Sequence, residues 1–343
     1  MTKIAIHYST SVFTKKWIEY CEEKNIPYKK VNCYDSDIIK QVEDCDALMW
    51  HHNQVLPTDY LVAKQILFSL EMKGIVVYPN WKTGWHFDDK LGQKYLFESL
   101  DLPHVKYHAF YNKKSAMDWL KNTKFPIVFK LRGGAGSKNV RLLKDYQAAK
   151  KIVNKAFSRG IRHYNVYEDI IDTYQLMKLK KASFKDLLKA IAHIIVPIKL
   201  ERSRGREKGY VLFQDFVPGL LSDIRVQVMG DKAYAMERKV RKNDFRASGS
   251  GKIDFDGSKI SKHLIKLSFD ISKRIEAQTI AFDFILDKTE YKLIEVSYGW
   301  GIADGELDPG YWDINLNWIS GQINPFAWMV EDVIKSIEKQ KSE

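Results

Sequence analysis

Short apolar runs alternate with amphipathic segments in the first part of the chain. The strand-like runs span 3–8, 27–32, 46–51 and 75–79. Two stretches with helical spacing of apolar residues, 13–24 and 58–72, lie among them. This βαβα order predicts a small parallel sheet covered by helices. No G-x-G-x-x-G sequence follows the first strand, so we predict no dinucleotide site there.

The remainder of the chain divides into two further blocks. In the first, a helix begins near Asp88, where acidic residues suit the helix dipole, and a strand spans 125–130. The end of this block is helical in pattern and strongly basic. Strand patterns return from residue 210 onward. We therefore predict a mixed α/β (α+β) protein with three parts: a βα domain at 1–85, a subdomain at 86–209 with a basic helical insert at about 160–208, and a C-terminal subdomain at 210–343.

An acidic residue interrupts each of two apolar strands within 282–299, Asp283 in the first and Glu295 in the second. A carboxylate inside an apolar strand is costly unless something compensates its charge. Mg²⁺ is a common partner, because it is bound by carboxylate oxygens together with substrate phosphates. Two antiparallel strands would set both carboxylates on one face of a sheet. The sequence leaves two interpretations open: a metal site, or acids of edge strands that face water.

A glycine-rich turn, R-G-G-A-G-S-K, follows the strand that ends at Lys130. Glycines let backbone amides approach an anion closely, and Lys130 and Lys138 supply positive charge. The turn is not a Walker A loop, because no Gly-Lys-Ser/Thr closes it. A phosphate-binding loop and a flexible hairpin both fit this pattern.

Further candidate residues lie on the strands that follow residue 210. The run 210–219 is an apolar strand that ends at a turn, where backbone groups can pair with a base, although an ordinary core strand has the same pattern. Arg238 and Arg246 are suited to bind a phosphoryl oxygen or an oxyanion, since a guanidinium group binds such groups bidentately. Salt bridges at the surface are the alternative for both arginines.

The positive net charge of the chain indicates which molecules it is suited to bind. Its 343 residues carry a net charge of +12, which favours anionic partners such as nucleotides, acidic sugars, phospholipid headgroups or nucleic acid. The three cysteines show no C-x-x-C spacing, as is typical of thiols in a reducing cytoplasm. The longest apolar stretch, 190–198, is too short to span a bilayer, and the first residues lack a secretory signal, so we expect a cytoplasmic protein.

The order of these residues resembles that of the ATP-grasp superfamily, especially its glutathione-synthetase-type and ribosomal-protein-glutamate-ligase-type members. The resemblance covers about residues 86–300. It implies an ATP-grasp fold preceded by a Rossmann-like βα domain. It also implies ATP and Mg²⁺, with two ions, as cofactors.

The resemblance implies a role for each matching position. Lys90 and Lys130 match lysines that contact phosphates, while Arg238 and Arg246 match arginines that hold the γ-phosphate and the intermediate. Arg238, Arg246 and Lys130 are therefore the expected catalytic residues. The other implied nucleotide contacts form a phosphate loop, an adenine hinge and a ribose-binding acid: Gly134, Gly136, Ser137, Lys138, Gln214, Asp215, Phe216, Val217 and Asp223. The implied metal ligands are Asp283, Glu295 and Ser297. We expect the loops 133–138 and 244–251 to close over the site.

Two positions depart from the usual pattern of the superfamily. Ser297 stands where a metal-binding Asn is usual, and Gln214 stands where Glu is common. The sequences R-A-S-G-S-G-K-I-D-F-D, E-V-S-Y-G-W, D-P-G-Y-W-D and L-N-W resemble a subgroup of bacterial ATP-grasp proteins associated with surface polysaccharides, in which this serine would be the norm. The candidate substrate contacts are Arg225, Ser248, Tyr298 and Trp300. The alternative for the two aromatic residues is that they fill a core.

The resemblance implies an ADP-forming carboxylate–amine ligase that acts through an acyl phosphate. The expected carboxylate belongs to an acidic sugar of a surface-polysaccharide precursor, and the expected amine is an amino acid or amino sugar. One alternative is a phosphotransferase of the same fold that acts on a hydroxyl group. Another is a basic nucleic-acid- or membrane-binding protein without catalysis, driven by residues 178–208. Only one aromatic residue, Phe184, occurs in that segment, so we expect no specific nucleic acid, while peripheral membrane contact and a homodimer stay open.

Overall fold

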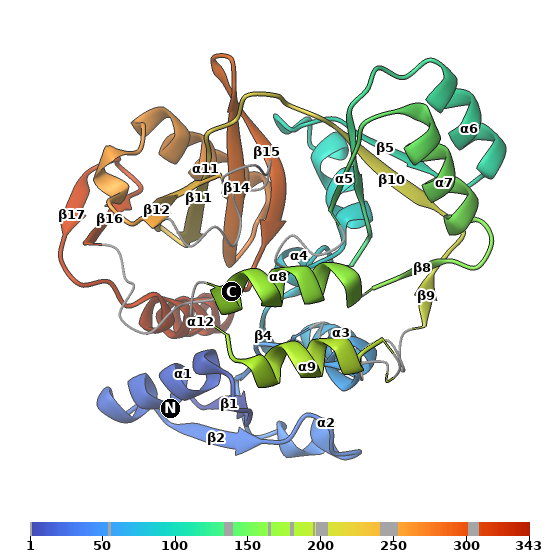
Figure 1. Ribbon diagram of the computed structural model, residues 1–343. Helices are drawn as coiled ribbons and strands as arrows, with labels where there is room; N and C mark the ends of the chain where they lie inside the picture. The colour runs from blue at the N-terminus through green and yellow to red at the C-terminus, as the bar shows by residue number, and fades with distance from the viewer. Residues whose placement is uncertain are drawn as a thin grey trace. The chain divides into compact units, whose positions relative to one another are not determined.

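The computed structural model describes residues 2–53, 56–133, 140–163, 166–178, 182–194, 196, 205–240, 253–300 and 309–343 (Figure 1). The chain folds into two compact units. Unit 1 comprises Met1–Asp88, Gly92–His104 and Gly219–Glu343, and unit 2 comprises Asp89–Leu91 and Val105–Pro218. The three-part division expected from the sequence stays a prediction.

The first sheet of unit 1 has four parallel strands in the order β2–β1–β3–β4. Its strands are β1 (Ile4–His7), β2 (Tyr28–Val31), β3 (Ala47–Met49) and β4 (Val76–Tyr78). The accompanying helices are α1 (Val12–Glu23), α2 (Ile38–Gln41), α3 (Pro57–Met72) and α4 (Trp81–Gly84). The predicted small parallel sheet is therefore confirmed.

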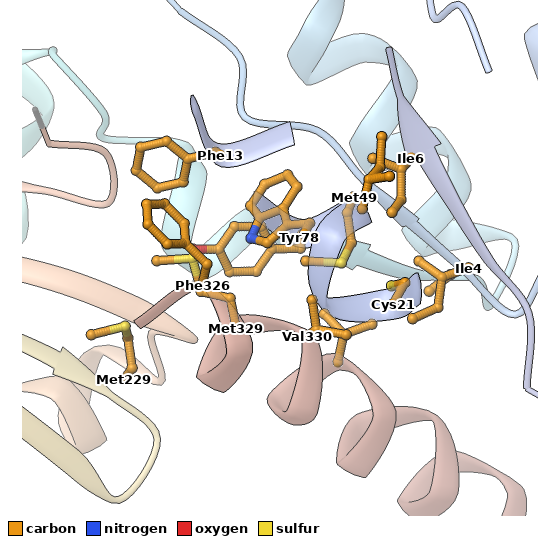
Figure 2. Packing of buried hydrophobic residues seen from close by; sticks show 14 of the residues in the cluster. Ile4, Ile6, Phe13, Cys21, Met49, Tyr78, Met229, Phe326, Met329 and Val330 are labelled. Atoms are coloured by element: carbon orange, nitrogen blue, oxygen red, sulfur yellow. The ribbon is translucent and has the colours of Figure 1, made fainter. Parts of the chain in front are cut away.

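Alternate residues of β1 enter two different cores, as the period of two in a strand requires. Ile4 and Ile6 belong to a core that includes α1 and the C-terminal helix α12 (Pro325–Ser342), whereas Ala5 belongs to a core with Leu67 of α3. Figure 2 shows the first of these cores, in which Val330 of α12 lies among side chains of the N-terminal sheet. Each such aliphatic side chain stabilises the fold by about 1.5–3 kcal/mol when fully buried.

The second sheet of unit 1 is antiparallel, with the order β15–β14–β11–β12–β16–β17 and with β13 beside β12. Its strands are β11 (Ser222–Met229), β12 (Lys232–Lys239), β13 (Ile253–Asp254), β14 (Thr279–Asp287), β15 (Glu290–Ser297), β16 (Gly310–Asp313) and β17 (Trp318–Ser320). A 3₁₀ turn η1 (Gly257–Lys259) precedes helix α11 (Lys262–Ile275), which packs against β11 and β14. Gly230, with φ +55°, and Asp231 form the two-residue turn between β11 and β12.

Unit 2 is built on an antiparallel sheet in the order β5–β10–β6–β7. Its elements are β5 (Tyr107–Phe110), α6 (Lys113–Lys121), β6 (Ile127–Lys130), β7 (Arg141–Leu143), α7 (Tyr146–Ala156) and β10 (Val211–Asp215). Phe129 and Phe213 enter a core with Leu120 of α6 and Val153 of α7, so these helices cover one face of the sheet. Helix α5 (Lys90–Ser99) begins in unit 2 and continues in unit 1.

The basic segment of unit 2 contains two helices that pack against each other, α8 (Val166–Lys178) and α9 (Phe184–Ala192). Ser183 and Asp186 form a capping box that begins α9. The predicted helical character is confirmed for these two stretches. The short paired strands β8 (Ile161–Arg162) and β9 (Arg206–Glu207) were not predicted, because two residues are too few for an alternating pattern.

Within the described ranges, the structure contains no helix with the length and apolarity needed to cross a bilayer.

Candidate active site

Five charged residues share one face of the second sheet of unit 1. Asp223 lies opposite Arg238 across β11 and β12, and Arg225 lies opposite Asp283 across β11 and β14. Asp283 also lies opposite Glu295 across β14 and β15. Side chains directly opposite each other lie on the same face of a sheet. The two acids of the β14–β15 hairpin therefore lie on one face, as the sequence predicts.

Four of these residues, which we term the charged cluster, form a continuous set of ion pairs: Asp223, Arg225, Arg238 and Asp283. Arg225 donates from Nε and Nη2 to Asp283 at 2.7 and 2.8 Å. Arg238 donates in the same way to Asp223 at 2.6 and 2.8 Å, and its Nη2 lies 3.0 Å from Oδ2 of Asp283. Arg225 is half-buried and the other three are buried. The guanidinium fork matches a carboxylate bidentately, which compensates the cost of burying these charges.

The charged cluster keeps Asp283 ionised. Burial acts to raise the pKa of Asp283, but the charges of Arg225 and Arg238 outweigh burial and hold this pKa well below its usual range. Burial and the negative charge of Asp283 raise the pKa of Asp223 to about 6, against the opposing effect of Arg238. At neutral pH, Asp283 is therefore an anion that can attract a cation.

The residues at this face fit a Mg²⁺ ion that is shared with a substrate. A carboxylate offers about four lone-pair positions, and three guanidinium contacts engage Asp283. Glu295 lies directly opposite it. In the part of the chain that the structure describes, no group of three or more His, Cys, Asp or Glu side chains is placed to hold a metal ion. Mg²⁺ is commonly bound by one or two carboxylates, waters and substrate phosphates, so these residues suit that mode rather than a cage made by protein alone.

Ser297 lies on the same face as the two acids, opposite Ala281. Its hydroxyl donates to the carbonyl oxygen of Gly299 at 2.5 Å. A hydroxyl whose proton is engaged in this way keeps its lone pairs for another partner. The geometry is therefore compatible with the metal-binding role that the resemblance implies for Ser297.

In unit 2, Lys130 and Gln214 share the sheet face opposite to the one that α6 and α7 cover. Lys130 pairs with Leu212, and Gln214 pairs with both Val128 and Tyr107, so their side chains alternate with those of the core face. The Nζ atom of Lys130 donates to the hydroxyl of Tyr107 at 3.2 Å and lies 5.3 Å from the centroid of its ring. These contacts fix a buried ammonium group on the sheet face opposite to α6 and α7.

Lys90, the other lysine predicted to contact phosphates, is hydrogen-bonded through its backbone near the end of β6. The backbone N–H of Lys90 donates to the carbonyl of Arg132 at 2.9 Å, two residues beyond Lys130. Both lysines are buried. The structure therefore brings the start of α5 to the end of β6, and a phosphate-binding role for the two lysines stays a prediction.

The predicted adenine hinge lies at the end of β10. Gln214 is buried, and its Nε2 atom has no hydrogen-bond partner among the described residues. A buried amide group without a partner costs about 1–3 kcal/mol, which a ligand acceptor would offset. Oδ1 of Asp215 lies 2.9 Å from Nε2 of His108, within hydrogen-bond distance. The next two hinge residues, Phe216 and Val217, are half-buried.

Several predicted site residues lie outside the described residues, and their roles stay predictions: Gly134, Gly136, Ser137, Lys138, Arg246 and Ser248. The same holds for the greater part of the two predicted closing loops, 133–138 and 244–251.

Tyr298 and Trp300 lie in the interior of unit 1. The hydroxyl of Tyr298 donates to the carbonyl of His52 at 3.0 Å, and the centroids of the Tyr298 and Phe87 rings lie 4.4 Å apart. Trp300 belongs to the first core and packs edge-on against Phe13. These contacts correspond to the core-filling alternative, and a substrate contact by either residue stays a prediction.

Sequence reasoning missed two residues that position the candidate groups. Tyr107 contacts Lys130 from a strand that is distant in sequence. Gln93 joins α5 to β15, because its Nε2 donates to the carbonyl of Val296 at 2.8 Å and its Oε1 accepts from the N–H of Val296 at 3.4 Å. Val296 lies between Glu295 and Ser297, so Gln93 holds the backbone of the predicted metal ligands. The only signal for Gln93 in the sequence is its place three residues after Lys90.

Solved structures of similar fold extend along nearly the whole chain. A D-alanine–D-alanine ligase from Bacillus anthracis is 14% identical with a TM-score of 0.54, over 100% of this chain and 99% of that chain. The same ligase has been solved in complex with ATP. The ATP-grasp ligase PsnB, in complex with a minimal precursor, Mg and ADP, is 10% identical with a TM-score of 0.52, over 98% of each chain.

A similarity to a curated protein covers a shorter part of the chain. A phosphoribosylamine–glycine ligase from Caldanaerobacter subterraneus subsp. tengcongensis is 25% identical over 119 residues, which are 34% of this chain and 28% of that protein. The chain thus matches less than a third of that relative's length. No protein-family profile matches the chain. The likeness to the solved structures shows a shared fold, and the predicted fold class is confirmed.

Proposed function

We propose that this chain, which has the ATP-grasp fold, is an ATP-dependent, ADP-forming ligase that joins a carboxylate to an amine. The observation that carries the proposal is the charged cluster, in which an ionised Asp283 lies opposite Glu295 and between two arginines. A Mg·nucleotide complex contains a metal cation and anionic phosphates. The carboxylates can bind the Mg²⁺ ion, and the guanidinium groups can bind the phosphoryl oxygens. The ligases solved with ATP, or with Mg and ADP, support this assignment through their similar fold.

Each group of residues has a proposed task. Lys90 and Lys130 bind the phosphates, and Gln214 binds the base. Asp283, Glu295 and Ser297 hold Mg²⁺, which neutralises phosphate charge when it is bound. Buried ammonium groups such as that of Lys130 bind an anion strongly, because little water screens them.

In the proposed reaction, the substrate carboxylate attacks the γ-phosphorus of ATP. The bond from this phosphorus to the β,γ-bridging oxygen breaks, which gives ADP and an acyl phosphate. The amine attacks the acyl carbon and loses a proton, and phosphate leaves as the amide forms. Arg225 and Arg238 supply positive charge for the phosphoryl oxygens and the tetrahedral oxyanion. Arg246, for which we propose the same task, lies outside the described residues.

We propose an acidic sugar of a surface-polysaccharide precursor as the carboxylate and an amino acid or amino sugar as the amine. The net charge of +12 supports an acidic substrate. The narrower resemblance of the sequence supports the sugar class.

The proposal is tested by following ADP and free phosphate in parallel. The full chain is incubated with Mg·ATP and with pools of uronic-acid sugars, amino acids and amino sugars. We expect ADP and phosphate to rise together, and only when an acid and an amine are both present. ADP without phosphate would show that the phosphoryl group stays on a product, and the phosphotransferase alternative would replace the ligase.

Removal of single charges tests the assigned residues. We expect Lys130→Met and Glu295→Gln each to lower ATP turnover by at least about 100-fold, because both remove charge that stabilises the transferring phosphoryl group. Lys121→Met and Glu290→Gln are the matched controls, since both residues are exposed and lie in the same two units. Thermal unfolding followed by circular dichroism checks that each variant is folded. Turnover in both site variants at the level of the controls would refute the site assignment.

A further inference from the structure

Gln227 is a buried glutamine whose side-chain amide has no hydrogen-bond partner in the part of the chain that the structure describes. It lies on β11 and has an exposed fraction of 0%. Neither its Nε2 nor its Oε1 atom is paired with another described residue. Burial of an amide carries a desolvation cost that only hydrogen bonds offset. The fold therefore keeps a costly polar group here without a structural use for it.

Other glutamines of unit 1 have both of their polar side-chain atoms paired. Gln93, which is also fully buried, exchanges two hydrogen bonds with the backbone of Val296, at 2.8 and 3.4 Å. Gln278, which is half-buried, bonds through both of its polar atoms to backbone groups, at 2.8 and 2.9 Å. Buried polar groups in proteins are ordinarily satisfied in this way. Gln227 departs from the pattern, which favours a partner from outside the chain.

The position of Gln227 on the sheet is next to the charged cluster. Arg225 is the neighbouring residue on the same face of β11, about 7 Å along the strand. Gln227 lies opposite Ala281 of β14, and Ala281 lies opposite Ser297 of β15, so these three side chains share that face. Because Ala281 ends at Cβ, no large side chain of this row separates Gln227 from Ser297.

An indole N–H belongs to the same region of the sheet face. Tyr234 of β12 lies opposite Gln227, and the centroids of the Tyr234 and Trp300 rings are 6.4 Å apart. Trp300 is 8% exposed, and its Nε1 atom has no hydrogen-bond partner among the described residues. Gln227 and Trp300, which we term the neutral pair, thus offer two donor groups and one acceptor that the fold leaves unused.

The chemistry of the neutral pair selects the class of ligand. A phosphate or carboxylate group would accept from both donors, but it would leave the Oε1 atom of Gln227 facing an anion. A metal ion or an ammonium group would bind that oxygen and leave the donors unsatisfied. A neutral group that carries a donor beside an acceptor satisfies all three atoms. Two adjacent hydroxyl groups of a sugar have this property, and so does a carboxamide.

We propose that Gln227 binds a neutral group of the ligase substrate, either a pair of adjacent hydroxyl groups or a carboxamide, and thereby determines which substrate the active site accepts. The proposal rests on the proposed ligase function, and it concerns a part of the substrate that does not react. The substrate carboxylate lies at the charged cluster, and the neutral group reaches Gln227 about 7 Å away. A site that hydrogen-bonds such a group rejects analogues that lack it, because its buried polar atoms then stay unpaired.

Thermal unfolding without any ligand tests whether the amide of Gln227 is unsatisfied. Gln227→Met keeps the length of the side chain and removes both unpaired polar atoms, so we expect its melting temperature to lie about 2 °C or more above that of the unaltered protein. Gln278→Met is the matched control, and it should lower the melting temperature because it removes two hydrogen bonds. A melting temperature of Gln227→Met at or below that of the unaltered protein would show that the amide is already satisfied, and it would overturn the proposal.

The rise in melting temperature on addition of a ligand tests the chemical class, with Mg·ADP present throughout. Glucuronic acid carries a carboxylate and adjacent hydroxyl groups, glutamine carries a carboxylate and a carboxamide, and adipic acid carries carboxylates alone. We expect glucuronic acid or glutamine to stabilise the unaltered protein and Gln278→Met, but not Gln227→Met. The ligand that does so identifies the source of the neutral group. An equal rise with adipic acid, a rise that Gln227→Met retains, or no rise with any of the three would overturn the proposal.

Kinetic constants distinguish a failure of this proposal from a failure of the ligase function. With ADP and phosphate followed in parallel, Gln227→Met should raise the KM of the substrate at least about tenfold and change kcat less, since the lost contact is to a part that does not react. An active Gln227→Met variant with an unchanged KM would overturn the role of Gln227 and leave the ligase function standing. An unaltered protein that forms no ADP with any acid and amine would overturn the ligase function instead, and the melting temperatures would still decide whether the neutral pair binds a ligand.

Discussion

Arg238 donates to Asp223 and contacts Asp283, so its removal would leave two buried carboxylates with less compensation. We expect Arg238→Met to lower the free energy of unfolding by about 3–5 kcal/mol, because breaking a buried pair leaves an uncompensated charge. Urea denaturation of the two proteins at neutral pH measures this difference.

Lys259→Met serves as the control for Arg238→Met. Lys259 pairs with Asp254 and Asp256 at 3.2 and 3.1 Å on an exposed surface, where such pairs contribute less than about 1 kcal/mol. A loss in Arg238→Met as small as in this control would contradict the buried charged cluster.

Two buried histidines of unit 1, His52 and His86, and the half-buried His51 should make its stability depend on pH. Burial lowers the pKa of His51 to about 4, of His52 to about 3 and of His86 to about 4. The unfolded chain binds protons at these residues below about pH 6.5 and the folded chain does not. Stability should therefore fall as the pH drops from about 6.5 to 4, by up to about 1.4 kcal/mol per pH unit for each histidine.

The raised pKa of Asp223 acts in the opposite direction. Since its folded-state pKa of about 6 lies above the ordinary value, Asp223 favours the folded state as the pH falls. Urea midpoints between pH 7 and 4.5 measure the net slope, and His86→Gln should reduce the slope by up to one proton. A slope that His86→Gln leaves unchanged would show that His86 is not buried as a neutral ring.

The charged residues were predictable from the sequence, but their partners were not. Asp283 and Glu295 stood out because each interrupts an apolar run, and the hairpin that joins them is local. The pairing of Asp283 with Arg225 depends on β11 lying beside β14, which no local pattern indicates. The bidentate contacts of the cluster therefore became visible only with the fold.

At the scale of elements, Gln93 fixes helix α5 against the strand of the predicted metal ligands. We expect Gln93→Leu to lower the free energy of unfolding by about 1–3 kcal/mol, because it leaves the buried backbone groups of Val296 without partners. The exchange of the Val296 amide hydrogen should become faster as well. Hydrogen exchange and urea denaturation test this, with the exposed Gln147→Leu as the control.

A protected Val296 amide in Gln93→Leu would indicate that β15 needs no support from α5. Loss of protection over all of β15 would instead show that Gln93 stabilises the whole strand.

Elements with a strong local signal were predictable. The parallel strands of the first sheet followed from short apolar runs. The order β5–β10–β6–β7 did not, because β10 pairs with strands that lie about a hundred residues earlier in the chain. Tyr107 reaches Lys130 only through this pairing, which is why its contact was missed.

For the whole molecule, a division of the sequence into successive blocks cannot show which blocks share a core. The sequence of helix α12 is amphipathic, but it does not indicate where the apolar side of this helix packs. Val330 and Val333 of α12 lie in one core with Ile4 and Ile6 of the first strand. This packing places the two ends of the chain in one unit, although they are farthest apart in sequence.

The charged cluster has a consequence for how Mg²⁺ and nucleotide bind. Its two arginines and two aspartates already neutralise each other. Mg²⁺ alone would compete with the arginines for the carboxylates, and ATP alone would compete with the carboxylates for the arginines. The two together allow an exchange of counter-ions in which no buried charge loses its partner.

We therefore expect Mg²⁺ or ATP alone to change the melting temperature little, and both together to raise it by several degrees. Ligand at a hundredfold excess over its dissociation constant stabilises a protein by about 2.7 kcal/mol. A full shift with Mg²⁺ alone would instead indicate a preformed metal site. If only the two together stabilise the protein, the affinity for Mg²⁺ depends on the concentration of ATP, and the affinity for ATP depends on the concentration of Mg²⁺. The protein then responds to metal and nucleotide as a single ligand.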